Sequence, residues 1–212
     1  PSLLTGVPFN ALAVIGDDIF AATSGRAYVT SDQGQNWRPI NQGSSPFGII
    51  NAMLSNGAKI YAAAAGGGVF LLSNSVQSWV GTSTGLTNRF VNAIVVNNNK
   101  LYAGTLGAGV FRSPAGDGSV SWTSTSAGLP SAANVQALAA SGPNLFAGLF
   151  GMGVYRSTNE GASWTFSGLA NQNINALGVS SAGLIFAATD TGMQRSTDQG
   201  TSWQSAGLNN QR

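Results

Sequence analysis

The five tryptophans of this 212-residue chain recur at an almost constant spacing. They lie 42, 43, 42 and 39 residues apart, at Trp37, Trp79, Trp122, Trp164 and Trp203. An Asn-Ala or Gln-Ala pair keeps step with them, beginning at residues 10, 51, 92, 136 and 175. An apolar-aromatic-Ala triplet does the same, beginning at residues 19, 60, 101, 145 and 185. Self-similarity at a fixed period marks a repeat protein, so the chain holds five copies of one unit.

Each unit consists of short apolar runs separated by Gly, Asp, Asn and Ser. In the first unit these runs are residues 11–15, 19–22, 27–29 and 37–40. They have the length of strands, and no helical stripe accompanies them. Four strands in about 40 residues is the size of one propeller blade. The sequence predicts an all-β fold, a five-bladed β-propeller of four-stranded antiparallel blades. It forms one domain over residues 1–212, with blades at approximately 8–46, 47–89, 90–132, 133–172 and 173–212.

The turn between the third and fourth strands carries a motif. It reads Thr-Ser-Asp-Gln-Gly-Gln-Asn-Trp at 30–37, Ser-Thr-Asn-Glu-Gly-Ala-Ser-Trp at 157–164 and Ser-Thr-Asp-Gln-Gly-Thr-Ser-Trp at 196–203. We call these three segments the box hairpins. They resemble the Asp-box, [S/T]-x-D-x-G-x-x-W, of the bacterial neuraminidase repeat propellers, which include sialidases. The second unit is eroded at this motif, and the third has two extra residues before Trp122.

The motif suits a hairpin, because Asp accepts backbone N–H groups, Gly takes a positive φ and Trp covers the turn from its apolar side. We therefore expect structural roles for Asp32, Gly34, Trp37, Trp79, Trp122, Asn159, Gly161, Trp164, Asp198, Gly200 and Trp203. The resemblance implies a fold rather than an activity, since Asp-boxes occur in sialidases, xyloglucanase-type hydrolases, sorting receptors and photosystem assembly factors. It also implies that two sets of loops share a ligand-binding top face, namely those from the fourth strand to the next blade and those from the second to the third strand.

Composition excludes several kinds of chemistry. The chain has no His and no Cys, so cysteine or histidine catalysis and cysteine-based metal sites are impossible. Charged residues make up 8% of the sequence without a Lys/Arg cluster, so we expect no nucleic-acid partner. The longest stretch without a polar side chain, 60–72, is shorter than the ~20 residues of a membrane span. We expect no cofactor, no metal and no membrane insertion, and favour a secreted or cell-surface location over the cytoplasm.

The carboxylates argue against hydrolysis. The implied topology places Asp190 alone on the top face, with the other six acids, at positions 17, 18, 32, 117, 160 and 198, in the opposite loops. A glycosidase needs two carboxyl groups about 5 to 10 Å apart. We therefore predict that the chain is not an enzyme and has no catalytic residues.

Two other recurring polar positions have structural explanations that we favour over ligand binding. Arg112, Arg156 and Arg195 share one position on the third strand, where stem packing and a bond into the nearby turn outweigh an anion clamp. The amides at residues 10, 51, 92, 136 and 175 begin the first strands. We expect each of them to tie down its entering loop.

The copies differ most in their top-face loops, and these differences suggest a ligand site. We place it at Arg89, Phe90, Phe150, Asn173 and Asp190, unless the loops have simply drifted. The chain is then a non-enzymatic, lectin-like propeller that binds a neutral glycan. The alternatives are a protein-interaction scaffold resembling photosystem assembly factors and, second, a glycoside hydrolase fragment.

The two ends of the chain compete for one place beside the first blade, since 3–7 resembles the end of a fourth strand and the fifth unit has its own. The chain is either part of a longer propeller or a ring closed by packing of the last blade on the first. We expect the closed, monomeric ring, with the first residues laid over the junction.

Overall fold

The computed structural model describes residues 6, 8–40, 48–73, 78–114 and 121–208. Their regular structure is all β: five sheets of four antiparallel strands, each in chain order. The described residues contain no helix of the length and hydropathy that a membrane span requires.

The strands follow the five repeats. Blade 1 contains β1 (Phe9–Ile15), β2 (Asp18–Thr23), β3 (Arg26–Thr30) and β4 (Arg38–Ile40). Blade 2 contains β5 (Gly48–Asn56), β6 (Lys59–Gly66), β7 (Gly68–Ser73) and β8 (Trp79–Gly81). Blade 3 contains β9 (Val91–Asn97), β10 (Lys100–Thr105), β11 (Gly109–Pro114) and β12 (Thr123–Ser124). Blade 4 contains β13 (Val135–Ser141), β14 (Asn144–Leu149), β15 (Gly153–Ser157) and β16 (Thr165–Gly168). Blade 5 contains β17 (Ile174–Val179), β18 (Ile185–Thr189), β19 (Gly192–Ser196) and β20 (Gln204–Ser205).

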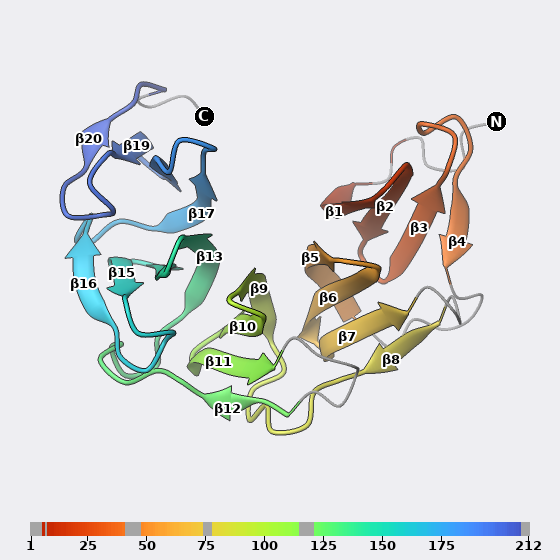
Figure 1. Cartoon of the computed structure of the whole chain (residues 1–212), viewed down its shortest axis with the longest axis horizontal. Helices are drawn as coiled ribbons and strands as arrows, with labels where there is room; N and C mark the ends of the chain where they lie inside the picture. Colours follow the sequence, from red (N-terminus) through yellow and green to blue (C-terminus); the bar gives the residue numbers. More distant parts are fainter. Residues whose placement is uncertain (1–5, 7, 41–47, 74–77, 115–120, 209–212) are drawn as a thin grey trace.

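The blades are arranged as in a β-propeller, with the first strands innermost and the fourth strands outside (Figure 1). Successive first strands contact one another, β1 with β5, β5 with β9, β9 with β13 and β13 with β17. Each first strand carries a register shift against its neighbour at the recurring Asn or Gln, for example between Ile50 and Ala52. This bulge gives the amide a direction of its own at the same place in every blade.

The core lies between blades rather than inside them. Four clusters of buried residues each combine side chains of two consecutive blades, such as Tyr102 with Trp164 and Phe146 with Ile174. Close packing at these junctions requires small residues on the second strand. A Cβ on Gly104 would lie 2.5 Å from Val135 in the next blade.

The tryptophans join neighbouring blades. The indole Nε1 donates to a carbonyl of the preceding blade, from Trp122 to Thr82 (2.6 Å), from Trp164 to Thr125 (2.7 Å) and from Trp203 to Ser167 (2.8 Å). Each acceptor stands three residues after the tryptophan of its own blade. Trp79, Trp122 and Trp164 are buried, whereas Trp37 and Trp203 in the outer blades are half-buried.

Each box hairpin is a closed hydrogen-bond network. In blade 5, Ser196 donates to Asp198 Oδ1 (2.8 Å) and accepts the backbone N–H of Gly200 (2.8 Å). Asp198 also accepts the backbone N–H and the hydroxyl of Ser202, at 2.9 and 2.5 Å. The residue before the glycine has a positive φ in all three hairpins, as the glycine has: Gln33, Glu160 and Gln199. The expected hairpin at Asp117 lies outside the described residues.

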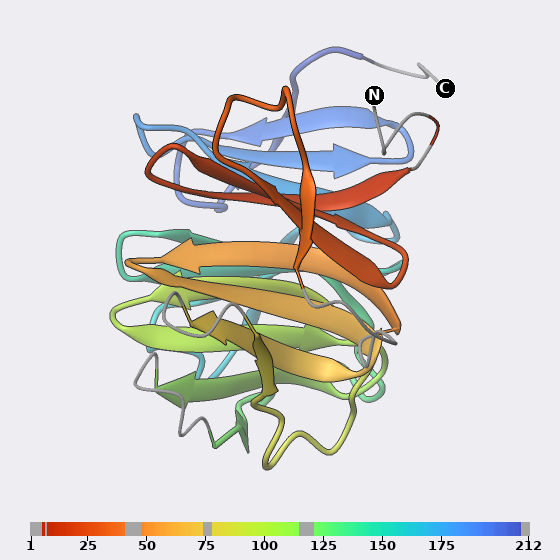
Figure 2. The same ribbon diagram turned by 90° about the vertical axis from the view of Figure 1, so that its right-hand side faces the viewer.

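The expectation of a closed ring is wrong for this structure. Figure 1 shows the ribbons of β1 and β17 well apart, and Figure 2 shows that blades 1 and 5 lie at the same end of the molecule. Leu12 and Val14 on β1 are 62% and 53% exposed, because no other described blade packs on this face. The curvature of the arc follows from the rotation between consecutive blades, which five repeats do not complete. The N-terminal segment expected over the junction lies outside the described residues.

The position of a tryptophan in the arc should decide what its removal costs. We expect Trp164→Ala to lower the free energy of unfolding by about 3 to 5 kcal/mol, because a buried aromatic is lost. Trp37→Ala should cost less than half of that, since its ring has one blade to pack against. Urea denaturation followed by circular dichroism measures both, and equal losses would contradict the assigned packing.

The box hairpins should make stability sensitive to acid. The N–H of Asn36 and the hydroxyl of Thr30 lower the pKa of Asp32 to about 2, and the hydroxyl and N–H of Ser202 lower that of Asp198 to about 2. Because the pKa of each carboxyl is lower in the folded state, the ionised group stabilises the fold at pH values above its unfolded-state pKa of 3.8. This stabilisation is lost as the pH falls through the folded-state pKa. We expect the melting temperature to fall between pH 4 and about 2.

Replacement by asparagine tests this origin of the acid sensitivity. Asn159 makes the corresponding bonds in blade 4, where its Nδ2 donates to Ser163. Asp198→Asn should therefore melt within about 2 °C of the parent at pH 7 and lose less on acidification. Asp32→Asn should be worse tolerated at pH 7, because Asn36 Nδ2 already donates to Asp32 Oδ2. An unchanged acid response in Asp198→Asn would assign the effect to other groups.

Candidate functional site

The residues predicted for the ligand site lie on the top-face loops but at two different junctions. Phe150, Asn173 and Asp190 come together between blades 4 and 5. Arg89 and Phe90 lie between blades 2 and 3. The structure therefore divides the predicted set into two candidate sites.

The site between blades 4 and 5 centres on the carboxylate that follows β18. Asp190 accepts one hydrogen bond from the amide of Asn173 and another from the amide of Asn175, the latter at 2.8 Å. Asn175 is the residue at the bulge of β17, which directs its side chain toward this loop. Both amide nitrogens point at Asp190, so their oxygens face away from it and can accept from a ligand hydroxyl.

An exposed aromatic residue lies on the neighbouring loop of blade 4. Phe150 is 53% exposed, and its backbone N–H donates to the carbonyl of Asn134 at 3.0 Å, which fixes the loop. The next residue, Gly151, lies beside Asn173, whose Oδ1 is 3.8 Å from the place that a Cβ on Gly151 would take. We call Phe150, Asn173, Asn175 and Asp190 the Asp190 cluster. It combines an apolar ring, a carboxylate and two amides on neighbouring loops of blades 4 and 5.

The junction of blades 2 and 3 is built around glycines. The carbonyl of Arg89 accepts the N–H groups of Gly66 (3.0 Å) and Gly68 (2.9 Å), and Phe90 forms an isolated antiparallel bridge with Ala65. Arg89 lines a pocket of about 370 Å³, together with Gly66, Gly67, Phe70, Gly81, Ser83 and Thr84. The ring of Phe90 is 50% exposed, 3.9 Å from the Cβ position of Gly66.

Apolar side chains are exposed on the top loops of three successive blades. Their exposed fractions lie between 40% and 53%, for Ile49, Phe90, Leu106, Phe150 and Met152. Ile49, Leu106 and Met152 were not predicted as site residues from the sequence. The repeat alignment held a signal for two of them, since Ile49 is the counterpart of Phe90 and Leu106 that of Phe150.

The recurring amides of blades 2 and 3 connect first strands. Asn51 Nδ2 donates to the carbonyl of Val91 (3.0 Å), and Asn92 Nδ2 donates to that of Val135 (3.1 Å). The bonds thus cross to the next blade, instead of tying down the entering loop of the same blade as the sequence suggested. Asn175 has no following blade within the described residues and turns to Asp190 instead.

The recurring arginines also reach the next blade. Arg112 Nη1 donates to the carbonyl of Glu160 (3.2 Å), and Arg156 Nη1 donates to that of Gln199 (2.8 Å). Each acceptor is the residue before the glycine of the following box hairpin. The expected bond into a turn is therefore present, but the turn belongs to the neighbouring blade. These arginines do not converge on a common anion.

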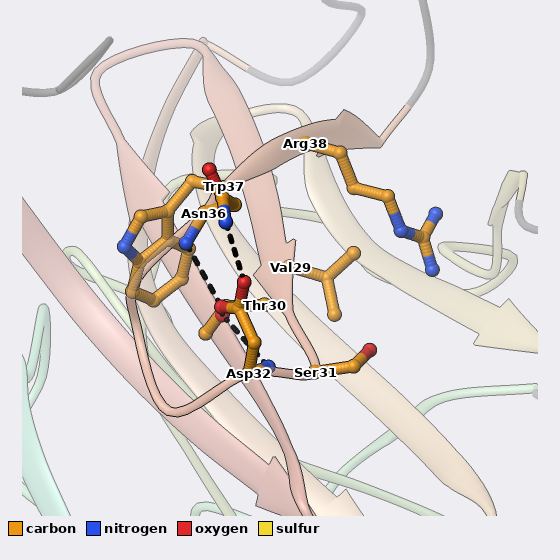
Figure 3. Close-up of a pocket in the computed structure, with 7 residues that line it drawn as sticks. All are labelled: Val29, Thr30, Ser31, Asp32, Asn36, Trp37 and Arg38. Atoms are coloured by element: carbon orange, nitrogen blue, oxygen red, sulfur yellow. Dashed lines mark hydrogen bonds between the residues drawn. The ribbon is translucent and has the colours of Figure 1, made fainter. Parts of the chain in front are cut away.

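A second pocket, of about 270 Å³, lies on the box hairpin of blade 1. It is lined by Val29, Thr30, Ser31, Asp32, Asn36, Trp37 and Arg38 (Figure 3). Figure 3 shows that the Asp32 carboxylate is engaged by Thr30 and Asn36, at 2.7 to 2.8 Å. The hairpin thus satisfies the acid at the centre of this pocket.

The remaining acids give no sign of a metal centre. Glu160 forms an ion pair with Lys100, whose ammonium group lowers the pKa of that carboxyl. Among the described residues no group of three His, Cys, Asp or Glu side chains is placed to hold a metal ion.

Solved structures share this arrangement of blades. The extracellular domain of a putative one-component system from B. thetaiotaomicron superposes with a TM-score of 0.78 at 15% identity, over 93% of this chain and 27% of that one. YCF48 from Cyanidioschyzon merolae superposes with 0.72 at 16% identity, over 91% and 70%. The Niastella koreensis GH74 enzyme superposes with 0.67 at 23% identity, over 96% and 32%.

The first of these chains is thus much longer than the present one, and no curated protein matches the sequence. The five four-stranded blades nevertheless agree with a family model: residues 78–212 match the DUF6242 β-propeller domain, and the chain belongs to that family.

Proposed function

We propose that the chain is a non-enzymatic binding propeller that recognises a neutral glycan through the Asp190 cluster. The observation that carries the proposal is the Asp190 carboxylate, held between two amides, with the half-exposed Phe150 on the neighbouring loop of blade 4. A sugar ring has an apolar face that an aromatic side chain can cover and hydroxyl groups that a carboxylate and amides can bind.

The engagement of three other acids supports binding over hydrolysis. Among the described acids, Asp32 and Asp198 are engaged within their hairpins and Glu160 is paired with Lys100. None of these three is therefore available as the second acid that a glycosidase uses. The GH74 enzyme shares the fold with this chain at 23% identity, and a similarity at that level does not assign its activity to this chain. Release of the chromophore from aryl glycosides tests hydrolysis directly.

Alanine substitutions in the Asp190 cluster should weaken glycan binding. We expect Phe150→Ala and Asp190→Ala each to weaken binding of the best neutral glycan from an array by about tenfold or more, as central contacts do. Both side chains are exposed in fixed loops, so the melting temperature should stay within about 2 °C. Calorimetric titration of that glycan measures the loss.

A matched control comes from the same blade. Phe166 is 52% exposed but lies on β16 against Tyr155, at 5.6 Å between ring centroids. Phe166→Ala should bind the glycan like the parent. Unchanged affinity in both cluster variants, or an equal loss in Phe166→Ala, would move the site elsewhere.

A second candidate function is a protein-interaction scaffold, and one observation favours it. The exposed side chains of Ile49, Phe90 and Leu106 form an apolar surface over blades 2 and 3, away from the Asp190 cluster. Exposed apolar patches mark docking surfaces for proteins. YCF48, one of the similar folds, has been solved with a bound D1 peptide.

The two functions respond to different changes. Phe90→Ala should leave glycan binding intact, because Phe90 lies at another junction, and should weaken capture of a protein partner. Either function fits a location outside the cytoplasm, as for the similar extracellular domain from B. thetaiotaomicron. A glycan bound only through Phe90 would reverse the assignment of the two surfaces.

A further inference from the structure

Three contacts recur where one blade meets the next. The indole of the later blade donates to a carbonyl of the earlier one, as from Trp164 to Thr125. An arginine of the earlier blade donates to the box hairpin of the later one, as from Arg156 to Gln199. The box glycine of the later blade packs on an aromatic ring of the earlier one, where a Cβ on Gly200 would lie 2.8 Å from Phe146. At such a junction the earlier blade thus supplies the arginine, the aromatic ring and the carbonyl for the indole, and the later blade supplies the indole and the box hairpin.

Blade 5 has the groups that the earlier blade contributes to these contacts, but no described blade supplies the groups of the later one. Arg195 stands at the position of Arg112 and Arg156, and its Nε is buried with no acceptor among the described residues. Phe186, the counterpart of the fully buried Tyr102 and Phe146, is partly exposed. The carbonyl three residues after the last tryptophan belongs to Ala206, the position that accepts an indole in the inner blades.

Blade 1 has the groups that the later blade contributes, namely the indole and the box hairpin. Its indole, Trp37, has no hydrogen-bond acceptor among the described residues and lies 6.2 Å from Phe9 between ring centroids. The carbonyl that an arginine would meet is that of Gln33, whose φ of 58° matches 57° in Glu160 and 56° in Gln199. Leu12 is 62% exposed, although its counterpart Ile94 is 9% exposed.

We propose that these two faces are docking surfaces for further blades of the same repeat. The blade that docks on blade 5 brings a box hairpin, whose glycine covers Phe186 and whose preceding carbonyl accepts Arg195. The blade that docks on blade 1 presents the carbonyl three residues after its tryptophan to Trp37. The junctions of blade 3 with blade 4 and of blade 4 with blade 5 already show all three contacts, so they define the geometry of the occupant.

The size of the opening favours two blades over a second copy of the whole chain. The five repeats match 70% of YCF48, so the unmatched 30% of that chain has the length of about two repeats. A second five-bladed arc docked on blade 1 with the same rotation per blade would run into blade 5. The occupant that fits is therefore a two-blade unit.

The test extends the full chain by its own last two blades. A second copy of residues 133–212 follows Arg212 directly, which places the next recurring amide 13 positions after Trp203, against 11 to 14 positions at the existing junctions. Arg195→Gln, made in the first copy, is then compared between the parent and the extended chain. Arg156→Gln is the matched control, because its acceptor is present in both.

We expect Arg195→Gln to shift the melting temperature of the parent by less than about 2 °C and that of the extended chain by about 5 °C. Arg156→Gln should shift both by about 5 °C. Trp37→Phe, which removes the indole N–H, should likewise matter in the extended chain and not in the parent.

Other outcomes overturn the proposal. Equal effects of Arg195→Gln in the two proteins would show that the appended blade does not meet Arg195. A parent whose mass rises with concentration in light scattering would show that a second copy occupies the faces instead.

Discussion

The indole hydrogen bond between consecutive blades is the interaction on which the rest of the structure depends. In blades 3, 4 and 5 it places the largest side chain of the repeat against the fourth-strand segment of the preceding blade, as Trp164 does at Thr125. The box hairpin fixes the turn from which the tryptophan projects, and the arginine of the preceding blade reaches back to that turn. Buried apolar clusters then form between blades, because each sheet alone is too thin to enclose one.

The sequence predicts the strands well, because strand patterns and turns are local. In the first unit the runs 19–22 and 27–29 fall within β2 and β3, and the run 37–40 covers β4. Five sheets of four antiparallel strands follow from the repeat. The open arc could not be predicted, because the rotation between blades depends on how side chains such as Val135 seat against Gly104 in three dimensions.

The candidate site was predictable only in part. Phe150 and Asp190 could be placed on one face, since the order of strands determines which loops share it. The order of strands does not determine where along the arc each loop lies, so Phe90 was grouped with them although it lies at another junction. The amide of Asn175 binds Asp190, whereas that of Asn92 binds the next blade, because only the fifth repeat has an acid at this loop position.

The contacts of the arc also determine how the molecule should open. The main contacts between blades join consecutive blades along the described chain, so the structure behaves as a one-dimensional row of coupled units. An inner blade is held at two junctions and an outer blade at one. Opening should therefore begin at the two ends and move inward, with the amide protons of β9 and β10 the slowest to exchange with solvent. A ligand that spans blades 4 and 5 would slow this fraying at one end.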